Sequence, residues 1–439
     1  MTARSLSRPW RGTFALCGST ILALLALTSV ASAQQTYAIR DARIVPVSGP
    51  VIDRGTIVIR GGLIADVGAT AAVPAGATVI DGKGLTVYPG LFDAATGLGL
   101  SEVPGIVESD DFSDLGEFMP QLMAFHAFHI DSVFVANARS AGILHVVTNP
   151  SGGMLAGQGA VMALAGWTAD EMELARHGPL TLDFPKLLNY EASAYTRRRH
   201  PYAETKDCAT KMRELTEFFA AARRYLEAKE RPAGSAGAVP ARDARYEAMI
   251  PVLKGQQPVF IEVQSDQDIR KAVEFAKEQK LNYALVGADD APKVADFLRE
   301  NGVRLILGLP GPLPIREDDP VDGVCRAAAT LHERGVSFAF GTGGQAADIR
   351  SLRHDVGMAV ACGLPYDVAL RSVTLTPAEF VGVAGQVGSI EKGKRANLVL
   401  TDGDIFEYGT HIKQTFVNGA PAGVESRYTD LYKKYKDRR

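Results

Sequence analysis

Cysteine is scarce in this chain, and its few cysteines are spread too widely to bind a metal together. The 439 residues contain four cysteines. Cys17 lies in an apolar stretch near the N-terminus, and Cys208, Cys325 and Cys362 lie far from one another. None of these three has a second cysteine or a histidine at the spacing of a metal site, and at most one disulfide can form among them. Cys362 stands in an apolar run, so we expect it to be a buried, unpaired cysteine.

The chain also lacks an excess of either charge. It has 47 basic and 50 acidic side chains, interspersed along its length, and a formal net charge of −3. This balance favours neither a nucleic acid nor a membrane surface as a partner. It leaves a small molecule, neutral or modestly charged, as the expected ligand.

No apolar run is long enough to span a membrane. The longest one, residues 14–27, follows three arginines and precedes Ala31-Ser32-Ala33. This order is typical of a secretory signal peptide, and a membrane helix needs about 20 apolar residues. Cys17 lies inside the stretch and away from the cleavage point, which argues against a lipid anchor. We therefore predict that residues 1–33 are a signal peptide and that the product is periplasmic or secreted, with no membrane anchor after cleavage.

The two ends of the mature chain share one pattern of short β-like runs punctuated by Gly and Asp. It covers residues 34–88 and returns in residues 385–425. Such runs predict small antiparallel sheets, and segments at opposite ends of a chain can complete one sandwich. We expect a small β-sandwich built from both ends, followed by a C-terminal tail at residues 426–439.

Between these ends, residues 89–384 alternate short apolar runs with amphipathic helices. Val259–Val263, Tyr283–Val286 and Arg304–Gly308 are strand-like, and helical patterns fill the gaps. This alternation predicts parallel strands with helical crossovers, most commonly closed into a barrel. Residues 205–243 contain a long helical pattern followed by a Gly- and Ala-rich linker. We interpret them as an insertion outside the barrel.

Several motifs carry a resemblance to a known family. Tyr88-Pro89-Gly90-Leu91-Phe92-Asp93-Ala94 near the start and Val387–Leu400 near the end resemble the entry to and exit from the barrel of the amidohydrolase superfamily. Gly157–Val161 is similar to its imidazolonepropionase-like branch. The resemblance implies an α/β fold, a (β/α)8 barrel joined to a small sandwich. It also implies hydrolysis of carbon–nitrogen bonds at a divalent metal.

The metal ligands that the family places at strand ends are replaced here. Ala95 and Gly97 stand where the resemblance implies His-x-His, and Val286 stands where it implies a histidine. The expected Gly-Thr-Asp is replaced within Gly341–Gly344. Ala, Gly and Val offer no lone pair to a metal. We therefore expect no metal ligands and no cofactor, although the family normally binds zinc or another divalent ion.

A few polar residues remain as candidates for the site. Glu262 occupies a strand end where the related branch has a histidine, and a carboxylate in an apolar pocket can act as an acid or base. A salt bridge within the pocket is the equally weighted alternative. The other candidates, expected to contact a bound molecule, are Asp93, Thr96, Gln264 and Thr342.

Three histidines are expected to be structural. His126 and His129 are three residues apart and could share a helix face, but two ligands do not make a catalytic site. Neighbouring phenylalanines favour packing instead. His145 follows apolar residues and is expected to lie in the interior.

These observations predict an exported amidohydrolase-family protein that has lost its metal centre. It would act as a degenerate homologue, as a small-molecule binder or as the partner of an active paralogue. The alternative is an active hydrolase of carbon–nitrogen bonds with a divergent site centred on Glu262, either without a metal or with a weak site formed by Glu262, Asp93 and Asp183.

Overall fold

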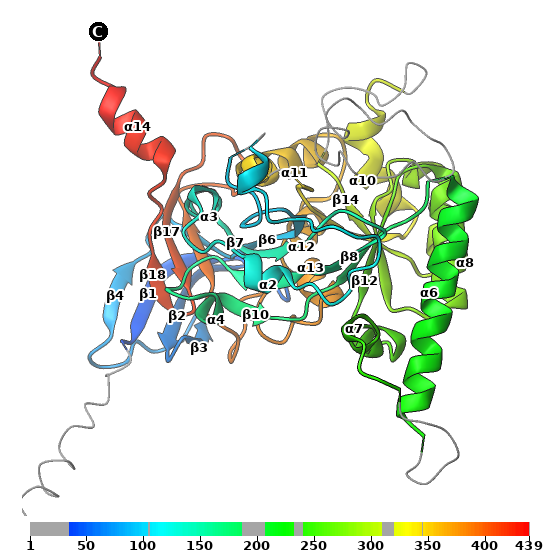
Figure 1. Cartoon of the computed structure of the whole chain (residues 1–439). Helices are drawn as coiled ribbons and strands as arrows, with labels where there is room; N and C mark the ends of the chain where they lie inside the picture. Colours follow the sequence, from blue (N-terminus) through cyan, green and yellow to red (C-terminus); the bar gives the residue numbers. More distant parts are fainter. Residues whose placement is uncertain are drawn as a thin grey trace, which may run out of the picture.

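The computed structural model describes residues 35–103, 106–186, 207–231, 240–309, 320–344 and 346–438 (Figure 1). The predicted signal peptide, residues 1–33, lies outside the described residues, as do residues 205–206 and 232–239 of the predicted insertion. No helix in the described ranges combines the length and the apolar character that a membrane crossing requires.

The two ends of the chain meet in one eight-stranded sheet with the order β18-β17-β16-β5-β1-β2-β3, and β4 pairs with β1. β5 joins the halves because it pairs with β1 on one side and with β16 on the other. Apolar side chains from both halves form one core, including Ile39, Ile57 and Phe416. Both ends therefore contribute to one β structure, but by strand pairing it is a single sheet, and the predicted β-sandwich is not confirmed. The strands are β1 (Tyr37–Ile44), β2 (Ile52–Arg60), β3 (Leu63–Gly68), β4 (Thr78–Asp81), β5 (Thr86–Pro89), β16 (Leu398–Thr401), β17 (Ile412–Val417) and β18 (Ala420–Ala422).

The central part contains two further sheets. One has four strands in the order β10-β9-β7-β6, and the other has six in the order β15-β14-β13-β12-β11-β8. Neighbours from β11 to β15 are parallel, as are β6 and β7. The strands are β6 (Leu91–Thr96), β7 (Ile143–Thr148), β8 (Leu155–Gln158), β9 (Ala160–Ala163), β10 (Glu173–Ala175), β11 (Leu180–Asp183), β12 (Val259–Val263), β13 (Tyr283–Gly287), β14 (Arg304–Leu307) and β15 (Ser337–Phe340).

The crossovers between these parallel strands are helical, as the sequence predicted. α8 shows why: the Ser265 hydroxyl accepts a hydrogen bond from Asp268 N at 3.2 Å and caps the helix. Its buried face includes Ile269, Ala272 and Ala276, at helical spacing. The helices are η1 (Val107–Ser109), α2 (Ala124–Ala127), α3 (Val133–Ser140), α4 (Ala169–Met172), α6 (Cys208–Lys229), α7 (Ala244–Leu253), α8 (Asp266–Glu278), η2 (Ala291–Val294), α9 (Ala295–Glu300), α10 (Gly323–Glu333), η3 (Ala346–Ser351), α11 (Leu352–Ala361), α12 (Tyr366–Ser372), α13 (Leu375–Phe380) and α14 (Arg427–Tyr435).

Among the described residues, no strand pairing closes the central sheets into a barrel. The fold is mixed α/β, and the (β/α)8 barrel predicted from the sequence is not confirmed. The two sheets nevertheless approach each other at two places. Thr96, at the end of β6, makes an isolated parallel bridge with Gly343, which follows β15. Gly159 separates β8 from β9 and exchanges backbone hydrogen bonds of 2.8 Å with Pro179 and Gly178.

α6, within the predicted insertion, packs against the body of the protein. Phe219 is fully buried, and its ring meets that of Phe275 on α8 edge-on, with the centroids 5.3 Å apart. Phe218 stacks on Phe118 with a centroid distance of 4.6 Å. The helix therefore contributes to the main core, and Figure 1 shows it along the outer side of α8.

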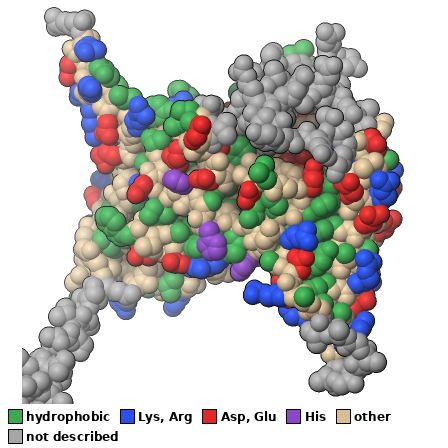
Figure 2. Space-filling view, in the orientation of Figure 1, with side chains coloured by type: hydrophobic (Ala, Val, Ile, Leu, Met, Phe, Trp, Pro, Cys, Tyr) green, Lys and Arg blue, Asp and Glu red, His purple; other side chains and the backbone are tan. Residues whose placement is uncertain are grey.

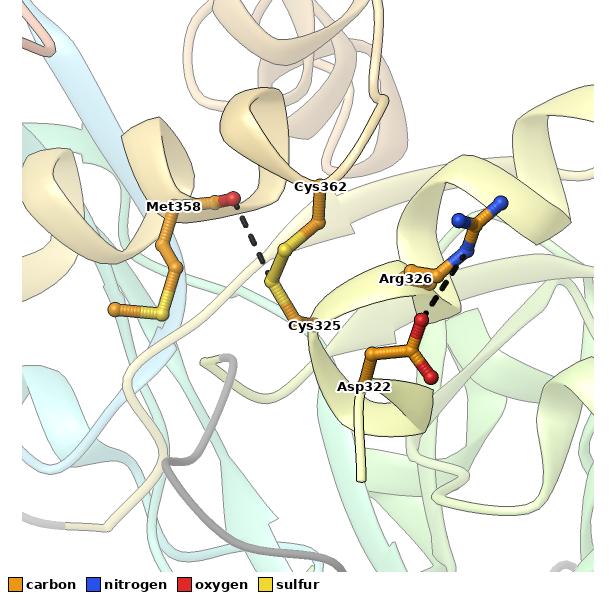
Figure 3. Close-up of a disulfide and its surroundings, with 5 residues drawn as sticks. All are labelled: Asp322, Cys325, Arg326, Met358 and Cys362. Carbon is orange, nitrogen blue, oxygen red and sulfur yellow. Dashed lines mark hydrogen bonds and ion pairs between the residues drawn. A yellow bond between two sulfur atoms is a disulfide. The ribbon is translucent and has the colours of Figure 1, made fainter. Parts of the chain in front are cut away.

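A disulfide joins Cys325 on α10 to Cys362 at the end of α11, with the Cα atoms 5.9 Å apart (Figure 3). The expectation that Cys362 is a buried, unpaired cysteine is therefore wrong. Cys208, at the start of α6, is the free cysteine among the described residues and is partly buried. The apolar residues around Cys362 belong to α11, whose end lies close to α10.

Candidate functional site

The parallel strands β11 to β15 place one row of side chains near their carboxyl ends. The pairing register aligns Asp183 with Glu262, Glu262 with Val286, Val286 with Ile306, and Ile306 with Ala339. Paired positions on neighbouring strands point to the same face of a sheet. Two carboxylates therefore stand at one end of the row, and three apolar side chains continue it.

Glu262 is partly buried, and its neighbour on β11 is a second carboxylate, that of Asp183. Burial raises the pKa of its carboxyl, and the neighbouring Asp183 carboxylate raises it further. Lys186 acts in the opposite direction and lies 3.7 Å from Asp183, measured from Nζ to Oδ1. A carboxyl in this setting holds a proton more readily than an exposed glutamate, and it can exchange that proton with a bound molecule or water.

A second polar cluster lies where β6 meets the segment after β15. Asp93 is fully buried, and its Oδ1 accepts hydrogen bonds from Thr342 N at 3.0 Å and from Ala95 N at 3.2 Å. The Thr342 hydroxyl donates to Asp93 Oδ2 and also lies 3.1 Å from Thr96 Oγ1. Burial raises the pKa of Asp93 to about 7, and the hydrogen bonds from Thr342 and Ala95 limit that rise.

Three of the four predicted pocket residues, Asp93, Thr96 and Thr342, are thus brought together. They bond to one another, which favours a structural part in joining β6 to the end of β15. Gln264 is separate: it is exposed beyond the end of β12, and its carbonyl accepts a hydrogen bond from Asp290 N. Glu262 has its own neighbours, Asp183 and Lys186. The five predicted residues therefore fall into separate groups.

Gly97, where the resemblance implies a metal-binding histidine, lies close to main chain. An ideal Cβ on Gly97 would lie 2.9 Å from the Gly344 carbonyl oxygen, and one on Gly341 would lie 2.8 Å from Ala95 N. Two backbone hydrogen bonds hold the end of β6 against the segment after β15: Gly343 N donates to Ala95 O at 2.8 Å, and Gly97 N donates to Gly343 O at 3.1 Å. Main chain thus fills the space that a histidine at position 97 would need.

No group of three or more His, Cys, Asp or Glu side chains among the described residues is placed to hold a metal ion. The weak site considered for Glu262, Asp93 and Asp183 is consequently not assembled. Two carboxylates on adjacent strands remain, fewer than the three protein ligands of a catalytic zinc site.

The three histidines considered from the sequence lie in different environments. α2 ends at Ala127, so His126 and His129 do not share a helix face, although their spacing of three residues would have allowed it. Both are exposed, and His129 Nε2 lies 3.2 Å from Asp111 Oδ2. His145 is fully buried, as predicted, and its Nε2 lies 2.7 Å from Asn397 Nδ2. Burial lowers the pKa of His145 to about 3, so it stays neutral.

Two cavities lie away from the predicted residues. One of about 710 Å³ lies between α3 and the β17–β18 turn. The other, of about 510 Å³, lies beside the ends of β13 and β14 and the start of α10, with Leu307, Phe340 and Ala328 among its lining residues. Asp322 and Arg326 of this lining also appear beside the disulfide in Figure 3.

Two features of the site were missed from the sequence. Lys186 follows Asp183 by three residues, and this spacing beside a strand end was the available signal. The close approach of Gly97 to Gly344 requires the two glycine-containing segments to meet in space. Their separation in the chain left no local signal for it.

Comparison with known proteins gives consistent matches. Residues 265–426 match the model of the amidohydrolase family. The chain is 23% identical over 395 residues to the amidohydrolase tasK of Hapsidospora irregularis, covering 83% of this chain. The match takes in only 39% of the length of that relative.

Solved structures agree with this fold. An amidohydrolase from Thermotoga maritima MSB8 superposes with a TM-score of 0.78 at 20% identity, covering 88% of this chain and 99% of its own. Phenylurea hydrolase B superposes with a TM-score of 0.55 at 17% identity, covering 89% of this chain and 97% of its own. At these identities the structural likeness concerns the fold alone.

Proposed function

We propose that the chain is an exported homologue in the amidohydrolase superfamily that has lost the family's metal centre and binds a small molecule at the ends of its parallel strands. One observation carries the proposal: the Gly97 position is closed against the Gly344 backbone, where the resemblance implies a metal-binding histidine. Neither the residue types nor the available space supports the family's metal site.

The proposal extends to the arrangement of the central sheets. We infer that they are two parts of one distorted barrel. Two contacts between them support this, the bridge from Thr96 to Gly343 and the hydrogen bonds around Gly159. In such a barrel the row from Asp183 to Ala339 faces inward, near the end where barrel enzymes bind their ligands.

Two independent features support export. The N-terminal sequence has the order of a signal peptide. The disulfide between Cys325 and Cys362 is of the kind that persists in oxidising compartments such as the periplasm. A protein of this description acts as a periplasmic or secreted ligand binder, or as the partner of an active paralogue that retains the metal ligands.

The row of side chains indicates what the site would bind. The carboxylates of Asp183 and Glu262 attract a hydrogen-bond donor or a cationic group, and Val286, Ile306 and Ala339 offer apolar contact. A small amide or amine with an apolar substituent has both properties.

A specific observation favours a second function, hydrolysis without a metal. The raised pKa of Glu262 suits a group that exchanges protons near neutral pH. As a carboxylate it would take a proton from a water molecule whose oxygen attacks the amide carbonyl carbon. It would then return that proton to the leaving nitrogen as the carbon–nitrogen bond breaks. Water and amide give a carboxylic acid and an amine.

One experiment separates the two functions. The purified protein is offered linear and cyclic amides and phenylureas, while thermal shift and amine release are followed for wild type, Glu262→Gln and Glu274→Gln. Glu274 lies exposed on α8 and serves as the control. Ligand binding predicts a shift of melting temperature without amine release, reduced in Glu262→Gln alone. Amine release that only Glu262→Gln abolishes would establish hydrolysis, and a flat screen in both assays would contradict both functions.

A further inference from the structure

The last described helix, α14, has an apolar face that the body of the protein leaves uncovered. Tyr428, Leu431, Tyr432 and Tyr435 follow the spacing of one helix face, and no residue of α14 is buried. Tyr432 is 69% exposed and Leu431 is 38% exposed. The guanidinium of Arg350 lies 4.4 Å from the ring of Tyr428, at the start of the helix. Figures 1 and 2 show α14 projecting from the body.

The charge of this segment is opposite to that of the remaining chain. Residues 427–439 contain six basic and two acidic side chains, a net charge of +4, and the whole chain carries −3. The difference leaves a net charge of −7 on residues 1–426. The α14 segment is therefore attracted to a protein with the composition of its own body.

The body carries a groove whose lining combines apolar side chains with acidic ones, and so complements the apolar, basic α14 segment. It is the cavity of about 710 Å³, and it includes Val135 on α3 and Pro421 on β18. Trp167 belongs to its lining and is 89% exposed, which is unusual for so large an apolar side chain. The carboxylates of Asp131 and Glu171 also belong to the lining.

The one guanidinium in this lining, that of Arg139, is occupied by main chain. It donates to the carbonyl oxygen of Leu164 at 2.9 Å and to that of Gly423 at 3.4 Å. Burial lowers its pKa. Arg139 therefore holds the β18 end of the groove to the loop before Trp167. Glu171 Oε2 accepts a hydrogen bond from Trp167 N at 2.8 Å, and the carboxylates of Asp131 and Glu171 make the lining acidic, which attracts basic groups.

We propose that α14 is a docking arm that inserts its apolar face into this groove on a second copy of the same chain. The groove includes Ala420–Gly423, and α14 begins at Arg427, so the arm leaves the body beside the groove. A twofold axis near this point places each arm against the groove of its partner, which is the reciprocal contact of a symmetric dimer.

The charges favour a second copy over a membrane. An anionic lipid surface would attract the basic arm but repel the acidic body, whereas the body of a second copy attracts the arm. Tyrosines form most of the apolar face, and tyrosine is enriched in the centres of protein interfaces.

The test is sedimentation equilibrium of the purified full chain. The double variant Leu431→Ser/Tyr432→Ser removes the centre of the arm face without touching a buried residue, and Trp167→Ala changes the groove. Tyr408→Ser is the matched control because Tyr408 is 85% exposed outside both surfaces. Wild type and the control are expected to be dimers, and the arm variant to dissociate at least tenfold more readily.

A mixing experiment tests reciprocity. The arm variant retains its groove, and a groove variant, Trp167→Ala/Ala136→Lys, which places a like charge opposite the basic arm, retains its arm. Each alone should be monomeric, whereas their mixture should form a heterodimer through one intact arm–groove contact. A monomeric wild type, a dimer unaffected by the arm variant, or a monomer that binds vesicles of phosphatidylglycerol through α14 would each overturn the proposal.

Discussion

At the scale of single residues, Asp93 belongs to the motif that resembles the start of the amidohydrolase barrel. The motif retains its aspartate, which now accepts hydrogen bonds from Thr342 and Ala95 and joins β6 to the segment after β15. Its pKa of about 7 comes from burial. The residue therefore couples the stability of this junction to pH.

We expect Asp93→Asn to flatten the dependence of stability on pH. Folding raises the pKa of Asp93 from 3.8 to about 7, so its favourable contribution is complete below pH 4 and is lost as the pH rises through 7. Three pKa units correspond to roughly 4 kcal/mol. Urea unfolding of wild type and variant at pH 4.5, 6 and 7.5 measures this. The wild type should lose stability relative to Asp93→Asn as the pH rises.

Asp93→Ala provides the contrast. It leaves Thr342 N and Ala95 N without their acceptor, so it should destabilise the protein by about 1–3 kcal/mol at every pH. Parallel curves for wild type and Asp93→Asn would show that the carboxyl does not titrate in this range.

Gly97 tests whether the metal position is closed by backbone. A Cβ at Gly97 would lie 2.9 Å from Gly344 O, so Gly97→Ala should destabilise the protein by about 1–3 kcal/mol. Gly344→Ala is the matched control, because nothing lies within 4 Å of its Cβ position. Chemical denaturation measures both. Equal stability of the two variants would show that position 97 has room for a side chain.

The residues of the site were predictable only in part. The sequence identified Asp93, Thr96 and Thr342 as polar groups near strand ends, and these three lie together. It did not separate them from Glu262, because the register between strands that are distant in the chain decides which side chains meet. Nor did it foresee the contact of Gly97 with Gly344, since the absence of a side chain gives no pattern in a sequence.

At the scale of helices and strands, the disulfide fixes α10 against the end of α11. It closes a chain segment with a sequence separation of 37. Cross-links of this kind stabilise a fold by about 2–4 kcal/mol, chiefly by restricting the unfolded chain.

Cys325→Ser/Cys362→Ser should therefore lower the free energy of unfolding by about 2–4 kcal/mol. Reduction of the wild type with dithiothreitol should have a similar effect. Cys208→Ser, which changes the free cysteine, is the control and should respond to reductant as the wild type does. Thermal unfolding with and without reductant distinguishes them, and a wild-type transition unmoved by reductant would count against a structural disulfide.

The elements themselves were largely predictable. Alternating apolar runs and amphipathic helices identified β12, β13 and β14 within a residue or so, because burial imposes the same periodicity on sequence and structure. The pairing of Cys325 with Cys362 was not predictable, since it depends on how α10 and α11 pack. The length of α2 was not predictable either: the helix ends at Ala127, so it includes His126 but not His129.

At the scale of the whole molecule, the chain has the fold of solved amidohydrolases, and the proposal is that its strand ends lack the metal ligands of that family. The sheet from both chain ends was foreseeable, since both segments share a β pattern and each has apolar residues to bury. A closed barrel was predicted from the central pattern and is not confirmed, because closure depends on strand tilt and register around the full circle, which a sequence pattern does not give. The projecting α14 was expected only as a C-terminal tail.

The central claim is that the metal centre is lost, and elemental analysis tests it most directly. The protein, purified without chelator, is offered zinc, manganese and iron in turn, and bound metal is measured after gel filtration. We expect well below one equivalent of each metal and an unchanged melting temperature. One or more equivalents that remain bound, and that Glu262→Ala removes, would contradict the account.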